Sequence, residues 1–413
     1  MVSGLKNVLV IGGGAAGLMA AVRAAQNGHN VTVIEKNQKP ARKLLITGKG
    51  RCNVTNNCDL DTLIANMTKN GRFLYSAFSG FGAADTMAFF EQQGVKLKTE
   101  RGGRVFPVSD RAVDIVDALW NATKKSGAKI VCGRVVDIVT TDNTVKGVAL
   151  EDGRQFSADA VIIATGGKSY SATGSSGEGY ILAKKLGHTV TDILPSLVPL
   201  KTHEGFCSYL SGLSLKNVTL SVFEEGKKKP VFSELGEMLF THFGVSGPLV
   251  LSASAHMRKM GKTPYVLKID LKPGLTYEQL YKRLQRDFAE NTNKNFGNAL
   301  DKLLPQKLIS VIVNLSGIKN DTKVNQITKE QRLELCKILK EFTLHPTAFC
   351  DIEEAIITSG GISVKEINPS NMESKLIRGL YFAGEIIDVD AYTGGFNLQI
   401  AFSTGNLAGG SIV

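Results

Sequence analysis

Residues 7–35 of the chain read NVLVIGGGAAGLMAAVRAAQNGHNVTVIE. The apolar run Asn7–Ile11 predicts a buried strand, and Val31–Ile34 predicts a second one. Between them, small and apolar residues from Leu18 to Gln26 recur at helical spacing. Together the three segments predict a strand–helix–strand unit of about 30 residues, the usual size of a βαβ crossover. We therefore expect an α/β protein of the Rossmann type.

The turn between this strand and helix carries Gly12, Gly14 and Gly17 in the spacing G-x-G-x-x-G. Gly12 permits a tight turn, Gly14 lets the backbone approach a pyrophosphate at the helix N-terminus, and Gly17 allows helix and strand to pack closely. Glu35 closes the second strand, where its carboxylate would hold ribose hydroxyls and repel a 2′-phosphate. FAD or NAD is therefore expected rather than NADP, and the alternative is a purely structural Gly-rich turn. The dinucleotide contacts expected in this unit are Gly12, Gly14, Ala15, Ala16, Gly17, Glu35 and Lys36.

The composition is that of an ordinary globular protein. The 413 residues are 43% hydrophobic and 21% charged, with a net charge of +11 that suits a phosphate-bearing cofactor and also permits nucleic acid. No apolar run approaches the roughly 18 residues that a membrane span needs, so we expect no membrane association and a cytoplasmic protein with an uncleaved N-terminus. The six Cys include no C-x-x-C pair and the six His are scattered, so neither a disulfide framework nor a metal site is expected.

Two later segments return to the nucleotide-binding pattern. The buried run Val161–Ala164 ends in Thr165-Gly166-Gly167, and Leu380–Ala383 runs into Gly384-Glu385. Residues 195–355 differ, because alternating runs there predict strands and amphipathic stretches predict helices over 277–290, 306–314 and 329–342. We expect a discontinuous nucleotide-binding domain over residues 1–194 and 356–413, with a second domain inserted between its halves.

A long, polar segment follows the second predicted strand: residues 42–56 read RKLLITGKGRCNVTN. This stretch resembles the R-K-L-L-x-[ST]-G-x-G-R-C-N-x-T-N signature of the YhiN/BaiN-like flavoproteins, which include aminoacetone oxidases and bile-acid enone reductases. The resemblance extends over nearly the whole chain. Its other landmarks are ERGGRVFP at 100–107, ATGGKSY at 164–170, TGSSGEGY at 173–180, FTHFGVSGP at 240–248, MESK at 372–375 and GLYFAGE at 379–385.

The resemblance implies a Rossmann-type FAD-binding domain of the glutathione-reductase class, split in sequence, with an inserted substrate domain made of a small β-barrel and a helical part. It also implies non-covalently bound FAD. Glu385 ends the last strand, where a carboxylate can accept ribityl hydroxyls, and Asp388 is an alternative for that role. Gly395 opens a helix whose N-terminus can stabilise negative charge on the flavin pyrimidine. The further cofactor contacts expected are Lys43, Thr47, Gly48, Arg51, Cys52, Asn53, Val135, Thr165, Gly166, Gly167, Gly384, Glu385, Asp388, Gly395, Phe396 and Asn397.

Five side chains are candidates for the chemistry itself. His242 could act as an acid or base near neutral pH, although a packed, hydrogen-bonded core histidine is the alternative. Arg104 and Arg51 could each orient an anionic substrate or the flavin phosphates. Cys52 and Cys58 invite comparison with redox dithiols, but their C-x5-C spacing adds one residue to the C-x4-C of disulfide reductases and changes helical phase by about 100°.

These observations predict a FAD-dependent oxidoreductase in which flavin N5 accepts a hydride. NAD(P)H-linked reduction of a small carbonyl or a conjugated alkene is the favoured reaction, and an amine oxidase using O2 is the alternative. A second Gly fingerprint for NAD(P)H is missing, because residues 174–179 have the order G-x-x-G-x-G, so a nicotinamide would dock in the substrate cleft. An RNA-modifying enzyme is disfavoured because basic residues are dispersed and only 7% are aromatic. A non-catalytic flavin-binding protein is a further alternative, and the oligomeric state stays open.

Overall fold

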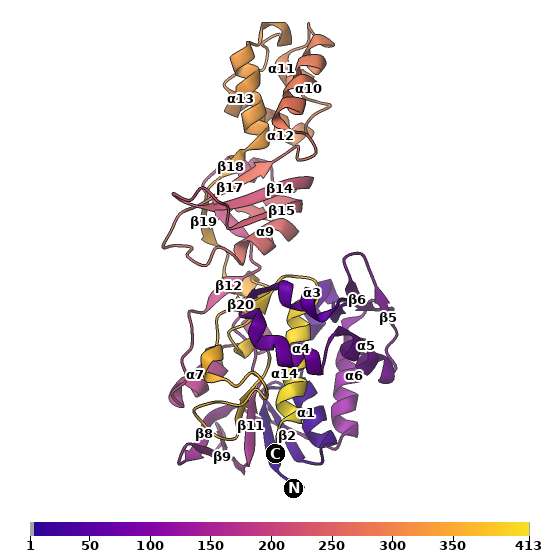
Figure 1. The fold of residues 1–413 in the computed structure, drawn as a ribbon, viewed down its shortest axis with the longest axis vertical. Helices are drawn as coiled ribbons and strands as arrows, with labels where there is room; N and C mark the ends of the chain where they lie inside the picture. Colours follow the sequence, from indigo (N-terminus) through magenta and orange to yellow (C-terminus); the bar gives the residue numbers. More distant parts are fainter. Residues whose placement is uncertain (1–3, 413) are drawn as a thin grey trace. The chain divides into compact units, whose positions relative to one another are not determined.

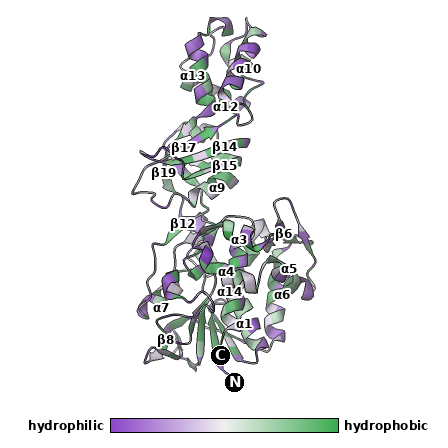
Figure 2. Cartoon of the chain, in the orientation of Figure 1, coloured by the Kyte–Doolittle hydropathy of each residue, from purple (hydrophilic) through white to green (hydrophobic). Residues whose placement is uncertain are grey.

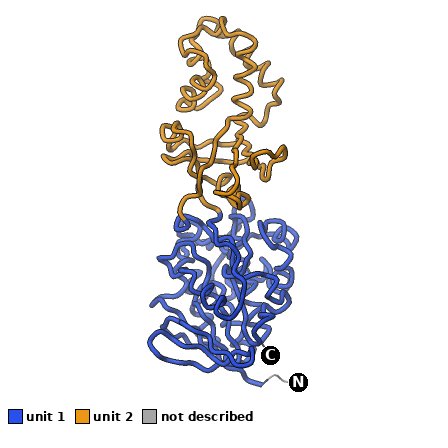
Figure 3. Tube along the Cα trace, turned by 90° about the vertical axis from the view of Figure 1, so that its left-hand side faces the viewer, with its two compact units in different colours: residues 1–196, 352–413 blue, residues 197–351 orange. Residues whose placement is uncertain are grey.

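The computed structural model describes residues 4–412. Contacts within the chain divide it into two compact units, which we call unit 1 (Met1–Ser196 with Ile352–Val413) and unit 2 (Leu197–Asp351) (Figure 3). The sequence-based boundaries lie at 194/195 and 355/356. Every helix within residues 4–412 is too short or too polar to span a lipid bilayer.

A five-stranded parallel sheet forms the centre of unit 1 (Figure 1). Its first crossover is the predicted one, because β1 (Asn7–Ile11) and β2 (Asn30–Glu35) pair in parallel on either side of α1 (Ala15–Gln26). The sheet order is β21-β11-β1-β2-β7, with the remaining bounds Leu380–Phe382 (β21), Ala160–Ile163 (β11) and Lys129–Cys132 (β7). The segments before and after unit 2 therefore contribute neighbouring strands to one sheet.

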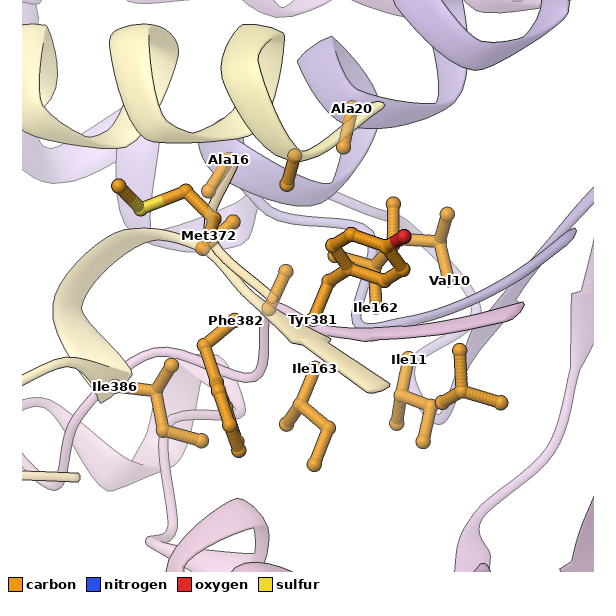
Figure 4. Packing of buried hydrophobic residues seen from close by; sticks show 14 of the residues in the cluster. Val10, Ile11, Ala16, Ala20, Ile162, Ile163, Met372, Tyr381, Phe382 and Ile386 are labelled. Atoms are coloured by element: carbon orange, nitrogen blue, oxygen red, sulfur yellow. The ribbon is translucent and has the colours of Figure 1, made fainter. Parts of the chain in front are cut away.

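The last helix of the chain, α14 (Phe396–Gly410), packs directly on α1. Gly405 and Gly409 make this close approach possible, since a Cβ atom at either position would overlap the carbonyl oxygen of Ala16 or Ala20. Figure 4 shows Ala16 and Ala20 on α1 above the buried strand residues Val10, Ile162 and Tyr381. Strand β1 and the two helices thus share one core, which holds the N-terminus of α1 in place at the end of the sheet.

Smaller elements complete unit 1. A three-stranded antiparallel sheet has the order β10-β9-β8, and β12 pairs with β20 in antiparallel fashion. The strand bounds are Thr55–Asn56 (β3), Met67–Lys69 (β4), Leu97–Thr99 (β5), Arg104–Pro107 (β6), Val135–Thr141 (β8), Thr144–Leu150 (β9), Gln155–Ser157 (β10), Leu194–Ser196 (β12), Ile357–Ser359 (β20) and Asp390–Ala391 (β22). The α-helix bounds are Arg42–Ile46 (α2), Leu60–Ala65 (α3), Tyr75–Gly80 (α4), Ala83–Gln92 (α5), Ala112–Lys125 (α6) and Glu178–Lys185 (α7).

Unit 2 contains a seven-stranded antiparallel sheet and a group of helices. The strand order is β18-β17-β14-β15-β16-β13-β19 from edge to edge, and closure into the expected barrel stays a prediction. The strand bounds are Leu200–Thr202 (β13), Ser214–Glu224 (β14), Phe232–Thr241 (β15), Gly244–Ser246 (β16), Tyr265–Asp270 (β17), Phe342–Leu344 (β18) and Pro346–Phe349 (β19). The helix bounds are Phe206–Tyr209 (α8), Pro248–Ser254 (α9), Tyr277–Ala289 (α10), Phe296–Ala299 (α11), Gln306–Ser316 (α12) and Lys329–Lys340 (α13).

The helices of unit 2 begin where local sequence indicates. Thr276 and Thr328 each cap a helix and accept a hydrogen bond from the backbone N–H three residues later, while Gln279 and Gln331 bond back to the caps. Figure 2 shows α10 with a hydrophilic face, and its buried residues recur at helical spacing. The predicted helix over 329–342 ends two residues early, because Phe342 pairs with Ile269 and starts β18.

Candidate functional site

A cavity of about 360 Å³ opens in unit 1 at the carboxyl ends of four parallel strands. Ile11, Ile34, Ala164 and Ala383 line it, each at or next to the end of its strand. In open parallel sheets this edge is where ligands bind, because helices begin there and their free N–H groups point outward. The cavity is therefore the candidate site.

The Gly-rich turn forms one wall of the cavity with bare backbone. Gly12 has a φ of +103°, and a Cβ there would lie 2.7 Å from the carbonyl oxygen of Ala164, so the tight turn needs glycine. Nothing lies within 4 Å of a Cβ built on Gly14, which lines the open cavity. Beneath the turn, a Cβ on Gly17 would overlap the carbonyl oxygen of Gly12. No side chain caps α1 and no acidic residue lies in its first turn, so its N-terminus is ready to receive an anion.

Glu35 is held rigidly at the end of β2. Its carboxylate is buried and accepts a hydrogen bond from the Gly13 N–H at 2.7 Å. Its other oxygen accepts from both the backbone N–H and the side-chain amide of Asn37, at 2.7 and 2.8 Å. An ionised carboxylate has about four acceptor positions, so these three donors leave room for a ligand hydroxyl. The carboxylate predicted to hold a ribose is thus oriented in advance.

An ion pair in the cavity wall joins two segments that are distant in the sequence. The Lys43 ammonium donates to Glu385 at 2.8 Å and to the Ser169 hydroxyl at 2.7 Å. Glu385 also accepts from the backbone N–H of Thr358 at 2.9 Å. The Thr358 hydroxyl accepts in turn from the backbone N–H of Lys168 at 2.7 Å and of Ser169 at 3.0 Å. This network fixes the loop after β11 against the loop after β21.

A second ionic contact joins the end of β2 to the loop before α7. Lys36 donates to the Ser176 hydroxyl at 2.6 Å and pairs with Glu178 at 2.9 Å, and Arg134 lies 3.4 Å from the same carboxylate. Burial favours the neutral form of Glu178. The hydrogen bonds from Lys36 and Ser176, and the nearby positive charges, outweigh burial and lower the pKa of Glu178 below its ordinary value. We call residues 173–178 the strap; Thr173, Gly174, Ser175, Ser176 and Glu178 of this segment line the cavity.

Helix α14 brings a second free N-terminus to the cavity. Gly395 precedes it with a φ of +102°, and a Cβ there would overlap the backbone of Thr55. No side chain caps this helix and no acidic residue lies in its first turn. Asn397 lines the cavity but is fixed by Ala391, accepting from its N–H at 3.1 Å and donating to its carbonyl at 2.9 Å.

Two buried polar atoms in the cavity wall lack hydrogen-bond partners within the described chain. They are the Asn53 side-chain carbonyl oxygen and the Thr165 hydroxyl. An unpaired buried polar atom costs about 1 to 3 kcal/mol, so such atoms mark places where a ligand completes the hydrogen bonding. Together with the bare glycine turn and two uncapped helices, they fit a polar, anionic dinucleotide such as FAD.

Most of the predicted cofactor residues line this cavity. Those brought together are Gly12, Gly14, Ala15, Ala16, Glu35, Lys36, Lys43, Thr47, Gly48, Asn53, Val135, Thr165, Gly166, Gly384, Glu385, Gly395 and Asn397. Those outside its lining are Gly17, Arg51, Cys52, Gly167, Asp388 and Phe396. Gly17 and Gly167 still shape it, because a side chain at either would meet Gly12 or Thr358.

Arg51 and Asp388 have protein partners instead. Arg51 lies 4.1 Å above the Phe106 ring and pairs with Glu100 and Asp110, and hydrogen bonds with these carboxylates raise the pKa of the guanidinium further. Asp388 is buried in an ion pair with Lys69. Phe396 is buried in the core. Arg104 also lies outside the cavity lining, with its side chain 48% exposed and its Nε donating to the Arg101 carbonyl at 3.2 Å.

Cys52 and Cys58 are both free thiols in separate hydrophobic surroundings. Burial raises the pKa of Cys52 to about 12 and that of Cys58 to about 11. Both are therefore protonated and poorly nucleophilic at neutral pH. The environment gives no support to a redox dithiol.

His242 lies in unit 2, in the turn between β15 and β16. Its side chain is exposed, with the ring 5.0 Å from that of Phe243. The alternative of a packed core histidine is therefore wrong, and a catalytic role stays a prediction.

Sequence reasoning missed several residues of the cavity wall. Asn37, Arg134 and Thr358 bind its loops together, and the strap carries Glu178. Two of them had a local signal: Glu178 lies in the TGSSGEGY stretch at 173–180, and Thr358 lies in residues 357–361, which read ITSGG. Asn37 and Arg134 are polar residues in loops, and nothing in their spacing predicts their contacts.

Fold and cavity together are those of a FAD-dependent oxidoreductase. The chain belongs to the family described as HI0933-like protein Rossmann domain, whose model matches residues 6–411. This match confirms the resemblance carried by residues 42–56 and the expectation of a flavin-binding Rossmann fold.

Curated relatives cover nearly the full chain. The chain is 31% identical over 411 residues to the 3-dehydro-bile acid delta(4,6)-reductase of Clostridium scindens, covering 98% of each chain. It is 32% identical over 402 residues to the ribosomal RNA dihydrouridine synthase of Haemophilus influenzae, covering 96% of each. Among solved structures, the 3-ketosteroid delta1-dehydrogenase of Sterolibacterium denitrificans matches with a TM-score of 0.53 at 13% identity, covering 98% of each chain, which shows a shared fold.

Proposed function

We propose that the chain binds FAD non-covalently in the unit 1 cavity and reduces a carbon–carbon double bond conjugated to a carbonyl, with electrons from NAD(P)H. One observation carries the cofactor part of this proposal. Two uncapped helix N-termini, the bare Gly12–Gly14 turn and the fixed Glu35 carboxylate all face one cavity. That combination suits a dinucleotide with a central pyrophosphate and a ribose at one end.

Different residues along the cavity would bind different parts of FAD. Glu35 would accept adenosine ribose hydroxyls, and the N–H groups at the start of α1 would bind the pyrophosphate. Glu385, held by Lys43, would accept ribityl hydroxyls, and the start of α14 would lie at the flavin pyrimidine, where its dipole stabilises negative charge. When bound, FAD supplies hydride transfer at flavin N5.

The chemistry shared by the relatives' names supports the reaction class. A delta(4,6)-reductase saturates ring double bonds, and dihydrouridine is uridine whose base has lost the double bond conjugated to its carbonyl. The two substrates differ greatly in size but present the same reacting group. Reduction of a conjugated alkene is therefore the chemistry we assign to this chain, with a small enone as the first substrate class.

Anaerobic flavin spectroscopy tests the proposal. Protein saturated with FAD is mixed separately with NADPH, NADH and aminoacetone, and the flavin absorbance is followed. Bleaching by a nicotinamide, with reoxidation by a conjugated enone, supports the proposal. Bleaching by aminoacetone alone identifies an amine oxidase and overturns the reductase. Bound FAD that none of the three reduces would favour a non-catalytic flavin protein.

A second candidate substrate is uracil within ribosomal RNA. Two observations favour it: a relative of equal similarity carries that activity in its name, and unit 2 is rich in positive charge. Residues 197–351 contain 22 Lys and Arg against 15 Asp and Glu, a surplus of seven out of eleven for the whole chain. Mass spectrometry of ribosomal RNA incubated with enzyme and NADPH tests it, because saturation of one uracil adds two hydrogen atoms to a defined nucleotide.

A further inference from the structure

Two loops of unit 2 that are separate in the sequence lie together in the fold. One is the turn between β14 and β15, and the other is the segment between α9 and β17, residues 255–264. Glu224 pairs with Tyr265 in the β14–β17 register, and the Glu225 N–H donates to the Pro264 carbonyl at 3.0 Å. The Lys259 N–H also donates to the Tyr265 hydroxyl at 3.2 Å. These bonds hold the two loops side by side.

Each loop carries three exposed basic residues. We call them together the basic surface: Lys227, Lys228, Lys229, Arg258, Lys259 and Lys262. Two acidic residues accompany them, Glu224 and Glu225, so the group has a formal surplus of four positive charges. In the sequence, Lys227, Lys228 and Lys229 are adjacent, whereas Arg258, Lys259 and Lys262 follow about 30 residues later. In the tertiary structure, the second loop brings Arg258, Lys259 and Lys262 next to the three lysines of the first loop.

Glu224 connects the two loops of the basic surface. It is buried and lies 3.3 Å from the ammonium groups of both Lys227 and Lys259. Burial opposes its ionisation, but hydrogen bonds from the two lysines prevail and lower the pKa of Glu224. One buried carboxylate therefore links a lysine of each loop, while the two side chains stay 61% and 57% exposed.

We infer that the basic surface binds the phosphate backbone of RNA. This inference rests on the second candidate of the proposed function, in which the substrate is a base within RNA. Clustered, exposed Lys and Arg bind phosphates without reading sequence, which positions a large RNA while specificity lies elsewhere. Each phosphate that is neutralised releases counterions, so binding through this surface must weaken steeply with salt.

The test uses full-length, FAD-loaded protein and a fluorescently labelled fragment of ribosomal RNA. The variant Lys228→Glu/Lys229→Glu/Lys262→Glu spares the two lysines that contact Glu224. The matched control, Lys96→Glu/Lys129→Glu/Lys146→Glu, changes net charge equally on exposed lysines of unit 1. We expect the first variant to lose at least tenfold in affinity, and its slope of log K against log salt to fall by about two to three. The control should change much less.

Three results would overturn the inference: no RNA binding at low salt, equal loss in both variants, or RNA affinity unaffected by the first variant. Binding of that surface to phosphatidylserine vesicles, without RNA binding, would also overturn it and indicate a membrane. Thermal unfolding of each variant reports its folding. Flavin reduction by NADPH in the same samples keeps the two hypotheses apart: normal reduction without RNA binding defeats this inference alone, and RNA binding without reduction defeats the proposed function.

Discussion

The Lys43 ammonium lies 2.8 Å from the Glu385 carboxylate, joining residues 342 positions apart in the sequence. Both side chains are about three-quarters buried, at 23% and 22% exposure. The pair connects the first half of unit 1 with the segment that returns after unit 2. The cavity wall therefore depends on the closure of the discontinuous unit.

Breaking this pair tests its importance. Lys43→Met leaves Glu385 partly buried with only neutral donors, and Glu385→Gln leaves Lys43 without its counter-ion. We expect each single variant to bind FAD about tenfold more weakly. If the two residues act as one unit, the double variant should bind FAD about as weakly as either single variant, which gives a coupling of ~1.4 kcal/mol in a double-mutant cycle. Additive effects in fluorescence titrations of FAD would show that the two residues act separately.

Gly14 should tolerate a larger side chain structurally but not functionally. Its Cβ position meets nothing within 4 Å, yet it faces the open cavity. Gly14→Val should therefore keep its thermal stability without cofactor and lose FAD affinity by about 100-fold, or ~2.8 kcal/mol. The flavin-to-protein absorbance ratio after saturation and gel filtration measures this. A valine variant that retains stoichiometric FAD would show that the cofactor lies elsewhere.

Gly17 should behave in the opposite way to Gly14. A Cβ on Gly17 overlaps the Gly12 carbonyl oxygen and lies 3.3 Å from Ala164 Cβ, so Gly17→Ala must push α1 away from the sheet. Overpacking of this kind costs about 1 to 3 kcal/mol of unfolding free energy. Gly14→Ala is the matched control, with an open Cβ position. Denaturant unfolding of the cofactor-free proteins should separate the two alanine variants; equal stability would contradict the packing described here.

Glu178 makes the fold sensitive to acid in a defined direction. Its folded pKa lies below the value of about 4.3 that an unfolded glutamate has. Its charged form therefore stabilises the protein fully above about pH 4.3, and this stabilisation is lost as the pH falls through the folded pKa. Glu178→Gln should lower the melting temperature at pH 7 and flatten its decline between about pH 5 and 3. Parallel pH profiles for the two proteins would refute this.

Thiol reactivity tests the surroundings of the cysteines. Cys132 is exposed, whereas burial raises the pKa of Cys52 to about 12 and of Cys58 to about 11. At pH 8, a disulfide reagent should react with Cys132 rapidly in the native protein and with Cys52 only after unfolding. Anaerobic NADPH should leave the number of reactive thiols unchanged. An increase by two would restore the dithiol hypothesis.

Local sequence was enough to predict the first crossover and much of the cavity. Gly12, Gly14 and Glu35 lie within one continuous βαβ unit, where periodicity and spacing are set by neighbouring residues. Residues 42–56 were recognised from their signature, although Arg51 and Cys52 within this stretch lie outside the cavity lining. Spacing places a residue in a loop, but its side-chain direction depends on partners such as Glu100 and Phe106, which lie about 50 residues further along the chain.

The amino-acid order thus contained the fold class, the glycine turn and the carboxylate at the end of β2, because each arises from contacts between near neighbours in the chain. Only the tertiary structure determined the Lys43–Glu385 pair, the contact of Lys36 with the strap, and the basic surface formed from two loops of unit 2. These features join segments tens to hundreds of residues apart. Local periodicity cannot predict these contacts, because long-range packing of the sheets and helices brings the segments together.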